Sequence, residues 1–253
     1  MREADAADKA RLLRSRTDAG LVFLDGFHAV KHALRFGAQE LTVFCEDPER
    51  LRALARRLAP DAAERLESVG VRVPADSVPL RADERAHGTA VWGVASRPAL
   101  PESLPDAGPV VVLESPRHAG NVGAAIRAAA AAGAGAVVVV DGPDPWGAAA
   151  VRGAAGTQFA LDVFALQHTS ELAALLPPDR QVIALSPAGA DIREVTVAKD
   201  AVFLFGTERA GLTDTALRLA DVTVRIPMRE GISSLNLAVS VAAALYLTAP
   251  SIG

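Results

Sequence analysis

The sequence alternates between short apolar runs and longer stretches in which apolar residues recur with helical spacing. Near-continuous apolar runs are typical of buried strands, and strands alternating with helices are typical of a parallel sheet covered on both faces. From residue 110 onward, strands are predicted at Val110–Leu113, Ala136–Val140, Leu161–Phe164, Gln181–Leu185, Ala201–Phe205 and Val222–Ile226. Helices are predicted at Val122–Ala132, near Pro145–Gly153, and at Ser170–Leu176, Asp214–Ala220 and Ser234–Thr248. This part is therefore expected to be an α/β domain with a parallel sheet.

The first part of the chain has the same mixed pattern on a smaller scale. Strands are predicted at Leu21–Leu24, Leu41–Cys45, Val71–Val73 and Ala90–Ala95, and helices at Ala4–Arg16, Asp25–Leu34, Pro48–Ala59 and Ala62–Val69. Four closely spaced prolines follow, namely Pro98, Pro101, Pro105 and Pro109. Proline at that density breaks both helix and sheet. We therefore predict a small α/β domain over residues 1–97, a linker over 98–109 and a larger α/β domain over 110–253.

Composition is that of a globular protein, with 50% hydrophobic and 22% charged residues. We expect neither a membrane span nor a signal peptide, and a cytoplasmic location, because no apolar run is long enough and Met1–Arg16 is charged throughout. The one cysteine, Cys45, allows no intrachain disulfide. The net charge of −4 disfavours a large nucleic-acid footprint, although basic residues concentrate in Met1–Leu100, with 16 basic and 15 acidic side chains.

Candidate chemistry lies in two glycine-bearing loops that each follow a predicted strand. Residues 206–212 read Gly-Thr-Glu-Arg-Ala-Gly-Leu, and residues 227–236 read Pro-Met-Arg-Glu-Gly-Ile-Ser-Ser-Leu-Asn. Ligands of open parallel sheets bind outside the carboxyl ends of the strands, and Gly206, Gly211 and Gly231 allow the backbone to approach a ligand closely. We therefore predict a small-molecule pocket whose walls are formed largely by these two loops.

Three segments resemble the motifs of one known family, in the order in which that family carries them. Residues 121–127, Asn-Val-Gly-Ala-Ala-Ile-Arg, are similar to Asn-x-Gly-x-x-x-Arg, motif one of the TrmH-type SPOUT RNA methyltransferases that methylate ribose 2′-hydroxyls. Residues 205–212 resemble motif two, and residues 226–236 resemble motif three. The resemblance implies S-adenosylmethionine as cofactor, RNA as substrate, a C-terminal trefoil knot and a homodimer. The pattern alone predicts an ordinary unknotted sheet.

The resemblance also implies roles for individual residues. It assigns the catalytic site to Asn121, Arg127, Glu208, Ser234 and Asn236. Cofactor contacts, mostly through backbone, are implied for Ser186, Leu204, Gly206, Glu208, Gly211, Ile226, Met228, Ser234 and Leu235. In the family the arginine that matches Arg127 is assigned to activating the hydroxyl. Because the pKa of arginine lies above about 12, we favour a role in holding an RNA phosphate and stabilising the developing alkoxide.

The same residues have simpler local explanations. Asn121 can cap the helix predicted after it, and Ser233 or Ser234 can cap the last helix. Arg127, expected near the start of its helix, can form a surface ion pair, and Glu208 can be a solvated loop residue. The presence of all three motifs favours the functional roles.

Two further segments resemble family features more loosely. Residues 20–97 resemble the ribosomal-protein-like substrate-binding domain that many of these enzymes carry. Arg152–Phe159 is similar to another family segment, although Ala160 and Asp162 stand where an arginine and a proline are common. RNA contacts are expected from His28 in the first of these segments, Arg152 in the second and Arg127 in motif one. Arg117 and His118, just before motif one, are also expected to contact phosphate, although simple exposure in a loop would explain them too. No metal is expected, because His28 and His32 lack a third ligand.

Other functions are weighed by what the sequence lacks. A dehydrogenase is disfavoured because no Gly-x-Gly-x-x-Gly opens a helix, and a nucleotide hydrolase because no Gly-x-x-x-x-Gly-Lys-Ser/Thr is present. A non-catalytic RNA-binding or ribosome-assembly protein that keeps the fold remains the alternative. Members of the family that carry such an accessory domain often act on large-subunit rRNA, so the resemblance implies rRNA rather than tRNA as the substrate of an enzyme.

Overall fold

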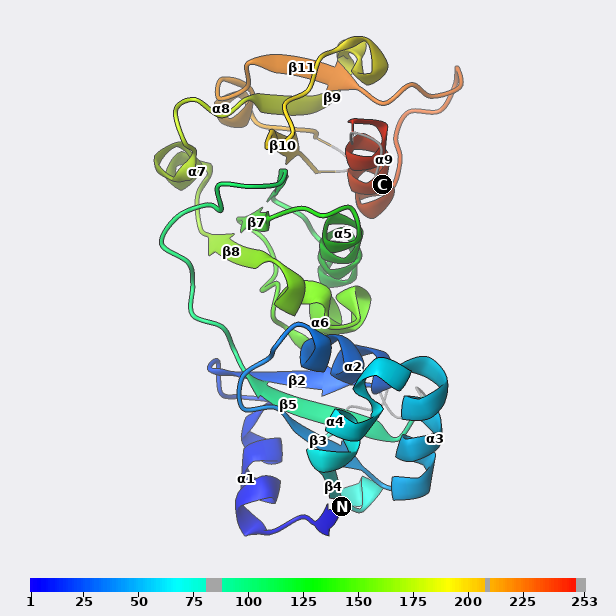
Figure 1. Cartoon of the computed structure of the whole chain (residues 1–253). Helices are drawn as coiled ribbons and strands as arrows, with labels where there is room; N and C mark the ends of the chain where they lie inside the picture. Colours follow the sequence, from blue (N-terminus) through cyan, green and yellow to red (C-terminus); the bar gives the residue numbers. More distant parts are fainter. Residues whose placement is uncertain (81–87, 208–209, 249–253) are drawn as a thin grey trace. The chain divides into compact units, whose positions relative to one another are not determined.

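The computed structural model describes residues 1–80, 88–207 and 210–248, and its elements are labelled in Figure 1. The chain forms two compact units, Met1–Ala99 with Trp146–Ala160, and Leu100–Pro145 with Leu161–Gly253. It therefore passes between units three times, whereas the sequence predicts one passage through residues 98–109. None of the helices in the described ranges has both the length and the apolar character needed to cross a membrane.

The first unit is built on a five-stranded sheet with strand order β1, β4, β3, β5, β2. Its strands are β1 (Arg2–Glu3), β2 (Leu21–Asp25), β3 (Thr42–Cys45), β4 (Gly70–Arg72) and β5 (Val91–Ser96). Its main helices are α1 (Ala6–Arg14), α2 (Phe27–Arg35), α3 (Pro48–Leu58) and α4 (Ala63–Ser68), with 3₁₀ turns η1 (Pro60–Ala62) and η2 (Ala75–Ser77). Strand β5 runs antiparallel to β2 and β3, and the other pairs are parallel. Apart from β1 and the two 3₁₀ turns, which were not predicted, these elements agree with the predicted ones to within a few residues.

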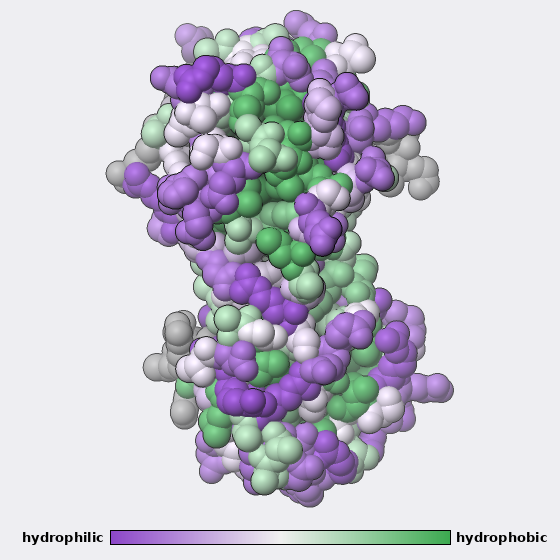
Figure 2. All heavy atoms as spheres, turned by 90° about the vertical axis from the view of Figure 1, so that its left-hand side faces the viewer, coloured by the Kyte–Doolittle hydropathy of each residue, from purple (hydrophilic) through white to green (hydrophobic). Residues whose placement is uncertain are grey.

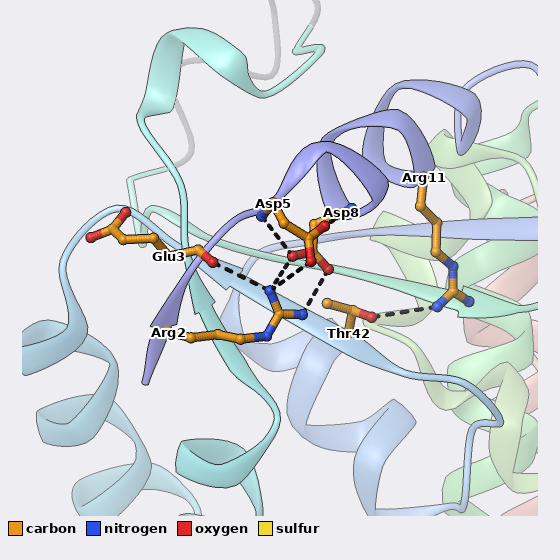
Figure 3. Close-up of polar contacts among 6 residues, drawn as sticks. All are labelled: Arg2, Glu3, Asp5, Asp8, Arg11 and Thr42. Carbon is orange, nitrogen blue, oxygen red and sulfur yellow. Dashed lines mark hydrogen bonds and ion pairs between the residues drawn. The ribbon is translucent and has the colours of Figure 1, made fainter.

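A small polar cluster holds the N-terminal segment at the edge of this sheet (Figure 3). Asp5 caps α1 by accepting a hydrogen bond from Asp8 N at 2.9 Å, and the Asp8 carboxylate accepts one from Asp5 N at 3.0 Å. Arg2 donates to both carboxylate oxygens of Asp8, and this interaction lowers the pKa of Asp8. The cluster fixes β1 against β4, a two-residue pairing that no apolar pattern predicts.

Residues 146–160 pack within the first unit through a close approach of two backbones. In the turn between α6 (Ala148–Ala154) and η3 (Thr157–Ala160), Gly156 has φ +77°, and a Cβ atom there would lie 2.4 Å from the Ala29 carbonyl oxygen on α2. His32 Nδ1 forms a 2.8 Å hydrogen bond with the Ala155 carbonyl oxygen. The segment packs on α2 through this hydrogen bond and this close backbone approach, which only glycine permits. The Arg152–Phe159 segment therefore belongs to the first unit, although its position in the sequence predicts the second.

The second unit is a six-stranded parallel sheet with strand order β11, β9, β10, β6, β7, β8. Its strands are β6 (Val110–Glu114), β7 (Ala136–Val140), β8 (Asp162–Leu166), β9 (Val182–Asp191), β10 (Val202–Phe205) and β11 (Val222–Arg225). Its helices are α5 (Ala119–Ala131), α7 (Thr169–Leu175), α8 (Asp214–Leu217) and α9 (Leu237–Thr248), with the 3₁₀ turn η4 (Ile192–Glu194). The predicted α/β class and parallel sheet are confirmed.

Helices cover both faces of this sheet (Figure 1). Leu172 of α7 and Ala216 of α8 pack on the face that carries Val112, Val138 and Leu204. Helices α5 and α9 pack against each other on the opposite face. The C-terminal helix thus returns from the edge strand β11 to the helix that follows β6.

Strand β9 is interrupted where it passes the edge strand β11. Thr223 of β11 pairs with Ala184, but the next residue, Val224, pairs with Ala190, so that residues 185–189 are left out of the ladder. A Cβ atom on Gly189 would lie 2.5 Å from the Val224 backbone. Glycine at this position lets the strand rejoin β11 after the interruption.

Arg180 fastens the residues before β6 to the second unit. Its side chain is 4% exposed and donates hydrogen bonds to three backbone carbonyls, those of Pro105 at 2.7 Å, Gly108 and Asp200. A buried guanidinium can satisfy several carbonyls at once because it carries five donors in a rigid plane. The proline-rich segment is thereby held in one conformation at this point.

We expect Arg180→Met to lower the free energy of unfolding by about 2–4 kcal/mol, because three carbonyls lose a charged donor in a site with little water. Urea unfolding followed by circular dichroism would measure the change. Arg218→Met is the matched control, since Arg218 is exposed and donates to the Thr215 hydroxyl alone among the described residues. Equal stability of the two variants would contradict the assigned role.

Candidate active site

A cavity of about 450 Å³ lies at the carboxyl ends of β9, β10 and β11, where ligands of parallel sheets bind. Its walls come from the first three residues that the β9 ladder leaves out, from the loops after β10 and β11, and from the first turn of α9. The lining residues are Leu185, Ser186, Pro187, Phe205, Gly206, Thr207, Ala210, Gly211, Leu212, Leu217, Arg225, Ile226, Met228, Ser233, Ser234, Leu235, Leu237 and Ser240. The two glycine-bearing loops therefore meet around one cavity, as their positions predict.

Most residues predicted to contact the cofactor lie at this cavity. They are Ser186, Gly206, Gly211, Ile226, Met228, Ser234 and Leu235. Leu204 does not line it, because its side chain is buried in the core of the sheet face covered by α7 and α8. Glu208, predicted both for catalysis and for the cofactor, lies outside the described residues.

The described residues of the loop after β10 are joined by hydrogen bonds and depend on glycine. Thr207 and Gly211 exchange two backbone hydrogen bonds of 3.1 Å each, and the Thr207 hydroxyl accepts a third from Ala210 N at 2.9 Å. A Cβ atom on Gly206 would lie 2.1 Å from the Gly211 carbonyl carbon, whereas Gly211 itself has φ +70° and free space around it. The loop therefore needs glycine at 206 for space and at 211 for its backbone conformation.

Motifs one and three meet through a pair of asparagines. Asn236 Nδ2 donates to Asn121 Oδ1 at 3.2 Å, although the residues are 115 positions apart. Asn236 also caps α9, because its Oδ1 accepts from Ala238 N at 2.9 Å. The predicted caps are wrong: α9 begins after Asn236 rather than at Ser234, and α5 begins at Ala119 after His118, which leaves Asn121 inside its first turn.

The remaining predicted residues are dispersed. Arg127 is exposed near the middle of α5 rather than near its start, does not line the cavity, and has no ion-pair partner in the described part of the chain. Arg117 and His118 are exposed just before α5. Arg152 on α6 and exposed His28 on α2 belong to the first unit. No group of three or more His, Cys, Asp or Glu within residues 1–80, 88–207 and 210–248 is arranged to hold a metal.

The sequence-based set misses several lining residues. Phe205, Thr207 and Leu212 lie within motif two, so taking every position of that motif rather than selected ones would include them. Leu237 and Ser240 come from the first turn of α9, where their three-residue spacing places them on one helix face. Arg225 is the lining residue with a charged side chain among those described, and it donates to the Gly189 carbonyl at 2.7 Å.

An ion pair stands at the end of β9, beside Arg225. Asp191 Oδ1 accepts from Arg193 N and from Arg193 Nε at 3.0 Å each, and Oδ2 accepts from Nη2 at 2.6 Å. These hydrogen bonds, with the positive charges of Arg193 and Arg225, lower the pKa of Asp191 to about 2. The carboxylate therefore stabilises the end of β9 only while it is ionised.

We expect this contribution to depend on pH in the acid range. Because the folded-state pKa of Asp191 lies below its usual value of 3.8, the stabilisation is complete above about pH 4 and is lost as pH falls towards about 2. The difference in unfolding free energy between the native sequence and Asp191→Asn, measured by urea at pH 6 to 3, should shrink with falling pH. In an Arg193→Gln background, Asp191→Asn should change the unfolding free energy by the same amount at every pH. A difference between the native sequence and Asp191→Asn that stayed constant from pH 6 to 3 would refute the prediction.

Comparison with known proteins gives consistent results. Residues 108–246 match the SpoU rRNA Methylase family. An uncharacterized tRNA/rRNA methyltransferase of Mycobacterium tuberculosis is 34% identical over 164 residues, 62% of this chain and 57% of that protein. A 23S rRNA (adenosine(1067)-2'-O)-methyltransferase of Streptomyces azureus is 26% identical over 244 residues, 92% of this chain and 87% of that protein.

The fold is also found in a solved structure. The SpoU methyltransferase AviRb from Streptomyces viridochromogenes, in complex with the cofactor AdoMet, has a TM-score of 0.74 at 23% identity, and the match covers 97% of each chain. The chain spans little more than half the length of the mycobacterial relative. The resemblance found in the three motifs is confirmed, because the matched region exceeds half of the 253 residues. This chain belongs to the SpoU rRNA Methylase family.

Proposed function

We propose that the protein transfers a methyl group from S-adenosylmethionine to a ribose 2′-hydroxyl of RNA, with rRNA favoured over tRNA. The observation that carries this proposal is that the loops of motifs two and three line the same cavity. In addition, a hydrogen bond between Asn236 and Asn121 joins motif three to motif one. The Streptomyces azureus relative, which this chain matches over most of its length, is named for the same reaction on 23S rRNA. An rRNA substrate would also mean a cytoplasmic location.

The cavity fits the proposed cofactor in size and chemistry. About 450 Å³ is within the usual range for a small-molecule site, and the walls combine apolar side chains with exposed backbone. Gly206 and Gly211 would hold it on one side, and the segment Ile226–Met228 with Ser234 and Leu235 on the other. When bound, S-adenosylmethionine supplies an electrophilic methyl group.

The protein residues would then orient the nucleophile and manage its charge. Ser234 lines the cavity, and the Asn121–Asn236 hydrogen bond fixes the starts of α5 and α9 relative to each other. We assign Arg127 to an RNA phosphate and to stabilising the negative charge that develops on the 2′-oxygen, because a guanidinium is a cation with several hydrogen-bond donors. Glu208 keeps its predicted catalytic role as part of this proposal.

RNA recognition would involve both units. We propose phosphate contacts by Arg117 and His118 of the second unit, and by Arg152 and His28 of the first, which we regard as the ribosomal-protein-like substrate-binding domain. Nothing in the comparisons supports the alternative of a non-catalytic RNA-binding protein. A filter-binding assay in which charge-removing changes at these positions left RNA affinity unaltered would refute the assignment.

We also propose a homodimer and a C-terminal trefoil knot. Helix α9 is apolar on every side, and Val239, Tyr246 and Leu247 are about half exposed on it, which supports a second copy as its partner. The return of α9 from the edge of the sheet to α5 supports the knot. A sedimentation experiment that found only monomers, unchanged by Val239→Glu, would refute the dimer, and a crystal structure would decide the knot.

The reaction can be tested directly. The purified protein is incubated with methyl-labelled S-adenosylmethionine and unmodified rRNA or tRNA, and the product is hydrolysed in alkali. Ribose methylation blocks cleavage at the modified nucleotide, so we expect label in an alkali-resistant dinucleotide from rRNA. Label in tRNA alone would change the substrate assignment from rRNA to tRNA. Binding of RNA without binding of the cofactor would favour the non-catalytic alternative.

A further inference from the structure

Glu114 is a buried carboxylate that no motif includes. It is the last residue of β6, is 2% exposed, and does not line the cavity. Its Oε2 accepts from Thr213 N at 2.8 Å, and its Oε1 accepts from the Thr213 hydroxyl at 2.7 Å and the Thr169 hydroxyl at 2.6 Å. A buried carboxylate is costly unless hydrogen bonds compensate it, so these three donors account for its burial.

Thr213 ends the loop of motif two. Gly211 and Leu212, the two residues before it, line the cavity. The backbone of both lies so close to Gly206 that a Cβ atom there would overlap with it. Thr213 also caps α8, its hydroxyl accepting from Ala216 N at 3.2 Å. The bonds to Glu114 therefore fix the downstream end of the loop that forms one wall of the cavity.

The upstream end of the same loop is fixed on the same strand. β10, which leads into Gly206, runs parallel to β6, and its last residue Phe205 pairs with Leu113. Glu114 follows Leu113 directly and precedes the segment that leads into α5 and motif one. Both ends of the motif-two loop are thus held at the end of β6.

We propose that Glu114 is a positioning residue that holds the motif-two loop in its cofactor-binding conformation. It acts through Thr213 and does not touch the cofactor. This role rests on the proposed function of the cavity. Thr169 bonds the same carboxylate, but it lies on α7, which contributes no lining residue in the described part of the chain.

The difference between the two threonines provides a matched control. Thr213→Val and Thr169→Val each remove one hydroxyl donor to Glu114 and leave a side chain of similar shape. Thr213→Val also removes the cap of α8, a loss that Glu114→Ala does not share. Glu114→Ala removes all three bonds, whereas Glu114→Gln keeps an oxygen for Thr213 N and an amide that can donate to both hydroxyls. The four variants separate loss of the loop anchor from a general loss of stability.

We expect S-adenosylhomocysteine, used as the binding probe in calorimetry, to bind Glu114→Ala and Thr213→Val about tenfold or more weakly than the native protein. Glu114→Gln should stay within about threefold, and Thr169→Val should bind normally even if its melting temperature falls as far as that of Thr213→Val. In turnover, KM for S-adenosylmethionine should rise more than kcat falls. Native affinity in Thr213→Val, or equal weakening in Thr169→Val, would overturn the proposal.

Amide hydrogen exchange tests the anchor without any cofactor. The amides of Thr207, Gly211 and Thr213 all donate hydrogen bonds in the loop, so they should exchange faster in Thr213→Val and Glu114→Ala but not in Thr169→Val. Unchanged exchange would overturn the positioning role. The native protein could fail to bind S-adenosylhomocysteine while the exchange pattern appeared as expected. That result would refute the proposed function but would support the role of Glu114 in holding the loop through Thr213.

Discussion

Arg127→Ala should lower kcat for methyl transfer by about 10²–10³-fold while leaving cofactor affinity unchanged. The side chain is exposed on α5 and does not line the cavity, so its removal should not disturb the cofactor. No ion pair within the described residues competes for its charge, which is therefore available to an RNA phosphate or a developing alkoxide. Single-turnover methylation with saturating cofactor, alongside calorimetric binding of S-adenosylhomocysteine, separates the two effects.

Two further variants define what Arg127 contributes. Arg127→Lys keeps the charge but loses the planar set of donors, so an intermediate rate would indicate electrostatic stabilisation with imperfect geometry. Arg11→Ala, in the first unit, is a control for the loss of an arginine elsewhere and should leave the rate unchanged. Full activity in Arg127→Ala would remove this residue from the proposed site.

Gly206→Ala should weaken cofactor binding by about 100-fold or more and should destabilise the second unit by about 3 kcal/mol. The added methyl group would lie 2.1 Å from the Gly211 carbonyl carbon and 2.3 Å from Leu212 N. Both neighbours are backbone atoms in the loop, so they cannot move without opening the Thr207–Gly211 hydrogen bonds. Calorimetry and urea unfolding would measure the two losses.

The same substitution at two other glycines separates steric overlap from backbone strain. Gly120→Ala in the first turn of α5 meets no atom within 4 Å and should be neutral. Gly211→Ala also meets no atom, but its φ of +70° makes an L-residue strained, so about 1 kcal/mol is expected. If Gly206→Ala behaved like Gly211→Ala, the close packing of the loop would not be what requires glycine.

The sheet of the second unit could be predicted because β6, β7, β10 and the start of β9 are near-continuous apolar runs. The pattern fails where the chain departs from regular pairing. The extension of β9 to Asp191 carries Pro187 and exposed residues, because residues 185–189 leave the ladder, and the first three of them line the cavity. The docking of residues 146–160 was equally out of reach, since it depends on what Gly156 meets in three dimensions rather than on any local pattern.

The site was predictable where function is carried by short motifs and unpredictable where it depends on distant pairs. Glycine loops after strands locate the cavity from the sequence alone. The bond between Asn121 and Asn236 and the bonds between Glu114 and Thr213 join residues 115 and 99 positions apart. Glu114 has no signal in one sequence, because a glutamate at a strand end usually faces water.

The docking of residues 146–160 on α2 also bears on how such proteins can be recombined during evolution. A gene that exchanged the codons for residues 1–99 with a relative would bring in a new α2 but keep the old Gly156 turn and its partner α6. The two halves of that contact would then come from different ancestors. Exchange of the first unit as an intact module therefore requires two segments to be inherited together, which should slow the shuffling of this unit relative to one joined by a single linker.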